Sequence, residues 1–425
     1  MIIHIVKRGE TISSIARNYG IDEEILIREN GVFNRESLVI GEALVIIYPK
    51  QIHIIQAGET LEGIAATYGI TVLEILRNNP YLSDRKYIYP GEKIIIQYKD
   101  LKIKKIATNG ATYTFVDENI LKKTLPYLTY LTVIGNIVTE EGGVLSVDDR
   151  DIVELAGLYG VAPIMMLTAF GNNQSEKIET THIILSDQEI QEQLLSNILF
   201  VLEEKGYAGI NVDSPYIYPQ DRENYMNFIE KLNIRLKSKG YKLFSTFGIS
   251  VFDVMSGIFF QDFDYSKLSQ AVDGVIFTAY EGGYEVGVPT GMLAFDTVLN
   301  FLEKLVGYIS SDKISIGLLN VGYLWQLPYI PGISKGQSIS YQSAIQLASD
   351  QGAKIMFDDT TKASYFQYVE IYDYIVRFWD ARAIDAYLKL VLVYELQGVT
   401  NNNISNFFYQ MWLIINTQYD IEKIF

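Results

Sequence analysis

Asn211, Asp213 and Pro215 occupy alternate positions in the stretch GYAGINVDSPYIYPQD, which runs from Gly206 to Asp221. Side chains two residues apart on a β-strand point to the same side, so a strand here would direct all three toward one place. A carboxylic acid such as Asp213 can exchange protons with a substrate, whereas proline has no side-chain proton to give. The spacing indicates a strand that delivers an acid into a site, with proline at the next position on that face.

A (β/α)₈ barrel is the architecture that we expect to position these residues. The segment from residue 100 to Phe425 has about 320 residues, a length that suits such a barrel with insertions. Short apolar runs alternate there with amphipathic helices, and eight runs are candidate strands. They are residues 104–110, 130–138, 162–170, 207–213, 241–248, 273–280, 313–322 and 396–402.

Composition excludes several classes of function. The 425 residues carry a net charge of −16, so nucleic acid and anionic membranes are poor partners. Cysteine is absent and the three histidines have no metal-ligand spacing, so we expect no thiol chemistry, no metal site and no cofactor. No apolar run is long enough to span a bilayer, and the first residues do not read as a secretory signal. We therefore expect a protein made in the cytoplasm without a signal peptide.

The first hundred residues contain an internal repeat. HIVKRGETISSIARNYGI (His4–Ile21) aligns with HIIQAGETLEGIAATYGI (His53–Ile70) at an offset of 49 residues. Each copy predicts a short strand, a Gly-Glu-Thr turn whose threonine caps a helix, a second helix and a closing strand. We expect a first copy at residues 1–49, a second copy at 50–99 and the barrel at 100–425.

Both copies resemble lysin-motif (LysM) domains. LysM domains bind N-acetylglucosamine chains in a shallow groove between the loop before the first helix and the loop after the second. The resemblance implies binding of a peptidoglycan-like or chitin-like glycan. An alternative is that Gly-Glu-Thr serves only as a turn and helix cap, and both roles are compatible. The implied groove residues are Gly9, Glu10, Thr11, Ile12 and Asn30 in the first copy and Gly58, Glu59, Thr60, Leu61 and Asn79 in the second.

The barrel segment resembles glycoside hydrolase family 18, in the spore-associated branch that carries N-terminal LysM domains. Stretches such as DGVIFTAYE and KISIGLLNVGYLWQLPY carry the likeness along the whole segment. In that family the fourth strand reads Asp-Gly-x-x-x-Asp-x-Glu. Its glutamate protonates the leaving oxygen, and its second aspartate orients the substrate acetamide, which attacks the anomeric carbon. Such enzymes depart from the scheme of two catalytic carboxylates.

This sequence departs from the family pattern at three positions. Ala208 replaces the first aspartate, Asp213 is retained, and Pro215 occupies the position of the catalytic glutamate. Asn402 stands where the family has the tryptophan that forms the floor of the sugar site. Other features of the family persist in this sequence. The resemblance implies that Tyr280 and Glu281 belong to a remnant catalytic site and that Trp325 binds substrate.

Three functions remain open from the sequence. The first is a glycan-binding and structural protein of the bacterial spore surface, coat or exosporium, whose barrel is an inactive scaffold. The second is an active N-acetylglucosaminidase on cortex peptidoglycan, with Glu281 or another carboxylate as a relocated acid. The third is a self-assembling protein of a spore layer, which would contact other layer proteins or its own copies.

Overall fold

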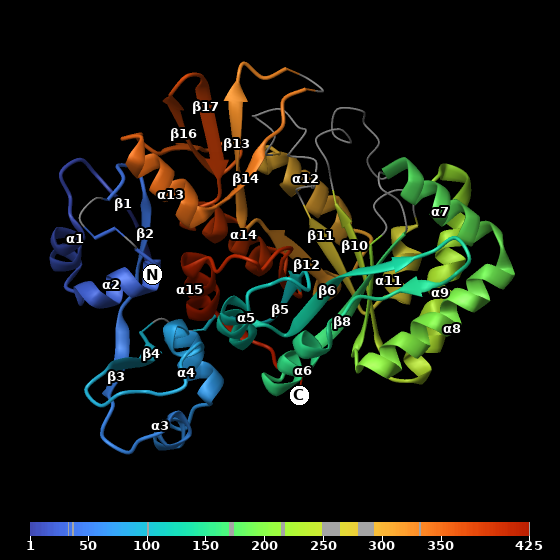
Figure 1. Ribbon diagram of the computed structural model, residues 1–425, viewed down its shortest axis with the longest axis horizontal. Coiled ribbons are helices and arrows are strands. Elements are labelled where there is room, and N and C mark those ends of the chain that lie inside the picture. Colours follow the sequence, from blue (N-terminus) through green and yellow to red (C-terminus); the bar gives the residue numbers. More distant parts are fainter. Residues whose placement is uncertain are drawn as a thin grey trace.

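The computed structural model describes residues 1–32, 34–35, 38–99, 102–169, 174–213, 217–248, 264–278, 293–330 and 333–424. Two small units, blue in Figure 1, lie beside a barrel that carries an additional small sheet. The N-terminal units contact the barrel along its side, away from the ends of its strands where the β-to-α loops lie.

The first copy has the predicted strand–helix–helix–strand order. β1 (Ile2–Ile5) pairs antiparallel with β2 (Ala43–Ile46), and α1 (Ile12–Tyr19) and α2 (Glu23–Asn30) lie between them in the chain. Thr11 caps α1 through its side chain, and α1 ends at Gly20, whose φ of 64° is the left-handed conformation that glycine adopts easily. The Gly-Glu-Thr turn is therefore a helix start, as the sequence predicted.

The second copy repeats this arrangement. β3 (Pro49–Ile54) pairs antiparallel with β4 (Lys93–Tyr98), and α3 (Leu61–Tyr68) and α4 (Val72–Asn78) complete the unit. Lys93 of this copy forms a 3.2 Å ion pair with Asp22 of the first copy. Arg28 of the first copy also lies over the Tyr81 ring, 4.7 Å from its centroid. The two copies thus contact each other as well as the barrel.

Eight parallel strands close into a barrel, which confirms the predicted architecture. The neighbour order returns to its starting strand, and each of the eight predicted segments contributes one strand. The strands, in barrel order, are β5 (Lys104–Thr112), β6 (Tyr130–Val138), β8 (Ala162–Ala169), β9 (Gly209–Asp213), β10 (Lys242–Gly248), β11 (Gly274–Thr278), β12 (Ile314–Leu318) and β18 (Gly398–Asn401).

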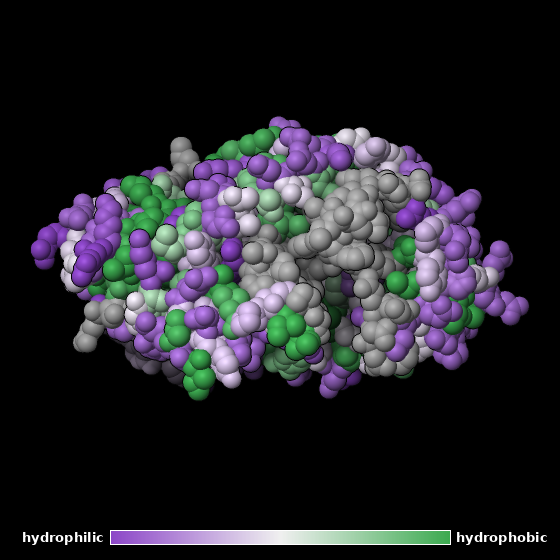
Figure 2. Space-filling view, turned by 90° about the horizontal axis from the view of Figure 1, so that it is seen from above, coloured by the Kyte–Doolittle hydropathy of each residue, from purple (hydrophilic) through white to green (hydrophobic). Residues whose placement is uncertain are grey.

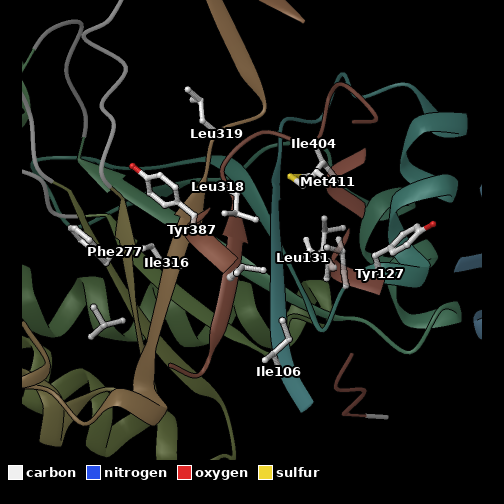
Figure 3. Close-up of a cluster of buried hydrophobic side chains, with 14 of the residues drawn as sticks. Ile106, Tyr127, Leu131, Phe277, Ile316, Leu318, Leu319, Tyr387, Ile404 and Met411 are labelled. Atoms are coloured by element: carbon white, nitrogen blue, oxygen red, sulfur yellow. The ribbon is translucent and has the colours of Figure 1, made fainter. Parts of the chain in front are cut away.

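Helices surround the barrel and cover the outward-facing side chains of its strands. Figure 3 shows Ile316 and Leu318 of β12 and Phe277 of β11 in the same buried cluster as Tyr387 of the surrounding helices. These helices are α5 (Glu118–Thr124), α6 (Arg150–Leu158), α7 (Gln174–Ser186), α8 (Gln188–Lys205), α9 (Arg222–Ser238), α11 (Tyr265–Ala271), α12 (Phe295–Val306), α14 (Ala381–Val393) and α15 (Tyr409–Gln418). The remaining short elements of the barrel segment are η2 (Leu125–Tyr127), η3 (Pro219–Asp221), η5 (Ser311–Lys313), β7 (Val144–Leu145) and β19 (Tyr419–Ile421).

A five-stranded antiparallel sheet is inserted between β12 and α14. It stands above the barrel in Figure 1, beside the end at which the β-to-α loops emerge. Its strands, in sheet order, are β14 (Gln337–Ser340), β13 (Val321–Leu327), β17 (Asp373–Phe378), β16 (Ala363–Val369) and β15 (Met356–Asp358), with α13 (Tyr341–Asp350) packed beside them.

Helix α15 joins the N-terminal copies to the barrel. Its residues from Gln410 to Thr417 are all buried, which is the behaviour of a helix enclosed on every side. Gln410 donates a 2.7 Å hydrogen bond to the Ala43 carbonyl of the first copy. Asn416 donates a 2.8 Å hydrogen bond to the Asn78 side chain of the second copy. The barrel and both copies therefore share one buried junction.

The described surface is mixed in character. Seen from above, hydrophilic residues predominate at both ends of the molecule, with hydrophobic residues interspersed (Figure 2). No helix in the described ranges is long and apolar enough to cross a bilayer.

Candidate functional site

The interior of the barrel is filled by side chains. Ile210 and Val212 of β9 point outward into the hydrophobic core, so the alternate residue Asn211 points inward. The Asn211 amide donates a 2.8 Å hydrogen bond to the Thr246 hydroxyl of the neighbouring strand. Deeper in the barrel, a cavity of about 10 Å³ lies between Asn109, Tyr130 and the side chains around them, which is room for one water molecule. This described cavity is too small for a sugar ring.

Asp213 ends β9 at this mouth and is half-buried. It pairs in register with Thr246, whose hydroxyl is bonded to Asn211, so the Asn211–Thr246 pair lies next to it. Pro215 lies outside the described residues, and so do Tyr280 and Glu281. From the family likeness we expect the Asp213 carboxylate to keep a hydrogen-bond donor, with Tyr280 the leading candidate, and this stays a prediction.

Asn402 lies at the same end of the barrel. It directly follows β18, whose last residue, Asn401, pairs with Gly110 of β5. Carboxyl ends of parallel strands meet at one end of a barrel, so Asn402 and Asp213 both face the mouth region. The structure places these two positions at the same end of the barrel.

Trp325 does not line an open sugar site. It lies on β13, where it packs with Tyr323 and Ile375 in the core of the five-stranded sheet, and only 1% of its surface is exposed. A Cβ at Gly336 would lie 2.6 Å from the indole nitrogen, so that chain segment covers the ring closely. The prediction of Trp325 as a substrate-binding residue was wrong, because neither ring face is available to a pyranose.

A histidine–aspartate pair near the mouth was not predicted. His182 of α7 and Asp221 of η3 are joined by a 2.7 Å contact between Nδ1 and a carboxylate oxygen, and Asp221 is buried. The His182 ring also packs edge-on against Tyr218. The pair fastens α7 to the segment that follows β9. The sequence offered no signal for it, since the two residues are 39 positions apart.

The Gly-Glu-Thr loops are held by the same side-chain relay in both copies. The glutamate, Glu10 or Glu59, bonds to a histidine of the preceding strand at 2.9 Å in the first copy and 2.7 Å in the second. That histidine, His4 or His53, contacts a tyrosine hydroxyl through its other ring nitrogen, at 3.1 Å in each copy. Repetition of His4 at position 53 was the signal that could have revealed this relay.

Electrostatics fix the glutamates of these loops as carboxylates. The Gln56 amide and His53 hold the pKa of Glu59 below its ordinary value. Burial raises the pKa of Glu10, but the Lys7 amide and His4 outweigh that effect and the pKa is lowered. The loops present their exposed backbone at Gly9 and Gly58, whose φ angles are 83° and 88°.

Three predicted groove residues are structural instead. Asn30 and Asn79 are buried at the ends of α2 and α4, and each bonds across to the backbone of the closing strand. Ile12 is buried in the core of the first copy. The side chains of these three residues are therefore unavailable to a ligand, because the two amides join helix to strand and Ile12 packs in the core. Thr11 and Thr60 are exposed, and Leu61 is half-buried.

Metal binding has no support among the described residues, where no group of three or more histidine, aspartate or glutamate side chains could hold an ion. Among the residues that the structure describes, the mouth presents Asp213, the Asn211–Thr246 pair and Asn402. These groups can orient and hydrogen-bond a polar ligand.

Comparison with protein families assigns both parts of the chain. A model of the LysM domain matches residues 4–46 and 53–97. A model of glycosyl hydrolases family 18 matches residues 163–406, more than half of the chain. The chain belongs to glycosyl hydrolases family 18.

Relatives of this family 18 chain match it from end to end. The cortical fragment-lytic enzyme of Bacillus subtilis (strain 168) is 31% identical over 428 residues, covering 100% of this chain and 99% of the relative. The cortical fragment-lytic enzyme of Bacillus anthracis is 29% identical over 424 residues, covering 98% of each chain.

Solved structures agree with this fold. The crystal structure of the spore cortex-lytic enzyme SleL from Bacillus megaterium QM B1551 gives a TM-score of 0.82 at 28% identity, covering 100% of this chain and 99% of that one. SleL from Bacillus cereus gives 0.81 at 26% identity, covering 99% and 98%. The whole arrangement, two LysM copies and a family 18 barrel, is therefore shared.

Proposed function

We propose that this protein binds N-acetylglucosamine glycan of the peptidoglycan or chitin type at the bacterial spore, and that its family 18 barrel is a scaffold without glycosidase activity. The observation that carries the proposal is Pro215, which occupies the position of the family's catalytic glutamate. A general acid must lie within about 2.6–3.2 Å of its target oxygen, directly or through one water. Proline has no proton to transfer, and losing a positioned acid lowers the rate by about 10²–10⁴-fold.

Further support comes from the remaining mouth. Asn402 offers hydrogen bonds but no apolar face for a pyranose ring, so the floor of the sugar site is altered together with the acid. Relatives named as cortical fragment-lytic enzymes and as spore cortex-lytic enzymes match the whole chain. They favour a spore location, with peptidoglycan as the glycan.

A second candidate is an active glycosidase with a relocated acid. It is favoured by Asp213, which stands at the family's acetamide-orienting position at the end of β9. In this case another carboxylate near the mouth would supply the proton.

The test is incubation of the full chain with chitooligosaccharides and with spore cortex fragments, followed by measurement of new reducing ends. We expect glycan retention by the protein and no new reducing ends. Turnover that disappears in Asp213→Asn would instead establish the glycosidase. Failure to retain either glycan would contradict the proposal as a whole.

A further inference from the structure

The turns that precede the closing strands differ sharply between the two LysM copies. Val39 and Tyr89 occupy equivalent positions, yet Val39 is 4% exposed and Tyr89 is 57% exposed. A Cβ added to Gly41 would lie 1.9 Å from the Ile355 carbonyl oxygen, whereas one added to the equivalent Gly91 would meet nothing within 4 Å. The turn of the first copy is buried against the barrel segment around Ile355, and the same turn of the second copy is open.

The strands beside these turns also differ in burial between the two copies. Ile3 and Ile5 of β1 pack against the core that the first copy shares with the barrel. Their equivalents in β3, Ile52 and Ile54, are both exposed. The apolar face formed by these isoleucines is therefore packed against the barrel in the first copy and exposed in the second.

The loops before the first helix of each copy also differ. In the first copy, the Thr11 amide donates a 2.9 Å hydrogen bond to the Ser14 hydroxyl. In the second copy, Gly63 takes the place of Ser14 and has no side chain, so the Thr60 amide lacks that acceptor. This amide is a donor that an acetamide carbonyl can use.

Tyr87 and Tyr89 lie in the segment that leads from α4 to β4 and ends in the Gly91 turn. The turn is joined to the strand end before the Gly58 loop, because the Gly91 amide bonds to the Ile55 carbonyl at 2.8 Å. Tyr87 is 62% exposed, with the Lys86 ammonium 5.5 Å from its ring centroid. Exposed tyrosines beside backbone donors suit a pyranose ring, which offers an apolar face and polar edges.

We infer that the second copy alone recognises glycan, through Tyr87, Tyr89 and the Gly58–Thr60 loop, and that the first copy is a docking module for the barrel. The inference rests on the proposed function, because it assigns glycan binding to one of two similar units. It requires that a chain of N-acetylglucosamine units contact residues 56–61 and 87–92, while the Val39–Gly41 turn of the first copy remains buried against the chain around Ile355.

The test uses the full chain and chitopentaose as the probe, with affinity measured by calorimetry. We expect Tyr87→Ala/Tyr89→Ala to weaken binding at least tenfold. The matched control is Arg35→Ala, an exposed residue in the equivalent loop of the first copy. We expect this control to change the Kd less than twofold. Hydrogen exchange with and without chitopentaose should show new protection in residues 56–61 and 87–92.

The outcomes separate this inference from the proposed function. Binding that survives the double variant, or new protection at residues 7–12, would overturn the assignment to the second copy and leave glycan binding intact. Absence of binding to chitopentaose and to cortex glycan by the unaltered chain would overturn the proposed function, and the inference with it. Thermal unfolding of each variant checks that the exposed substitutions leave the fold unchanged.

Discussion

The Asn416 side-chain amide donates a 2.8 Å hydrogen bond to the side-chain oxygen of Asn78, and both residues are buried. Asn78 in turn donates to the Ile96 carbonyl, so α15 is joined through it to the sheet of the second copy. Loss of one partner of a buried hydrogen bond leaves the other unsatisfied. We therefore expect Asn416→Ala to lower the free energy of unfolding by about 1–3 kcal/mol, measured by denaturant titration. Gln346→Ala, at an exposed helical position, is the control and should have little effect.

Stability should depend on pH through two buried carboxyl groups of the first copy. Burial raises the pKa of Glu29 to about 7, and the hydrogen bond from Tyr98 and the charge of Arg28 oppose this only in part. Burial likewise raises the pKa of Glu42 to about 7, opposed by the Val39 amide. The ordinary value of both is 4.5, so the folded state binds more protons than the unfolded state between these values.

Because the folded state binds more protons, the free energy of unfolding falls as the pH rises. We expect the contribution of each group to this free energy to be fully present below pH 4.5 and to be lost as the pH rises toward 7, by roughly 3 kcal/mol per carboxyl group. Denaturant titrations at several pH values measure the slope. Glu29→Gln and Glu42→Gln should each flatten it. An unchanged slope in both variants would show that other groups set the pH dependence.

The equivalent glycines Gly41 and Gly91 provide a matched pair of substitutions. Both have positive φ, 90° and 88°, so alanine at either position is strained by about 1 kcal/mol. At Gly41 the added Cβ also collides with the Ile355 carbonyl. We expect Gly41→Ala to destabilise the chain by about 1–3 kcal/mol more than Gly91→Ala, in denaturant titration. Equal effects would contradict close docking of this turn.

Restoring hydrolysis should require two changes at the barrel mouth. Pro215→Glu returns an acid, but Asn402 still gives no floor for the sugar ring. Because acid and floor act on one substrate, their effects are non-additive. We expect little release of reducing ends by Pro215→Glu and clear release by Pro215→Glu/Asn402→Trp. Adding Asp213→Asn to the double variant should abolish that activity.

The barrel and the LysM copies could be predicted because their signals are local. Apolar runs such as residues 313–322 are separated by helices, and β12 formed where one was expected. Thr11 and Thr60 cap helices because the side chain of a threonine before a helix can accept a hydrogen bond from a backbone amide of the first turn. Local chemistry of this kind is visible in a single stretch of sequence.

The misassigned residues depended on contacts that are distant in sequence. Asn30 reads equally well as a groove residue or as a buried link to β2, and only the fold decides between them. Trp325 was assigned by family likeness, but its surroundings come from β17 and from Gly336. The docking of the first copy depends on Gln410, which lies 367 residues after its partner Ala43.

That distance has a consequence for synthesis of the chain on the ribosome. Gln410 of α15, the helix that covers the docking face of the first copy, is translated 367 residues after Ala43. At 5–20 residues per second, translation leaves this apolar face without its partner for roughly 20–70 s. During that interval the face is open to chaperones and to neighbouring nascent chains. Assembly of the junction therefore waits until α15 has been made, although the copy itself is small enough to fold while the barrel is still being translated.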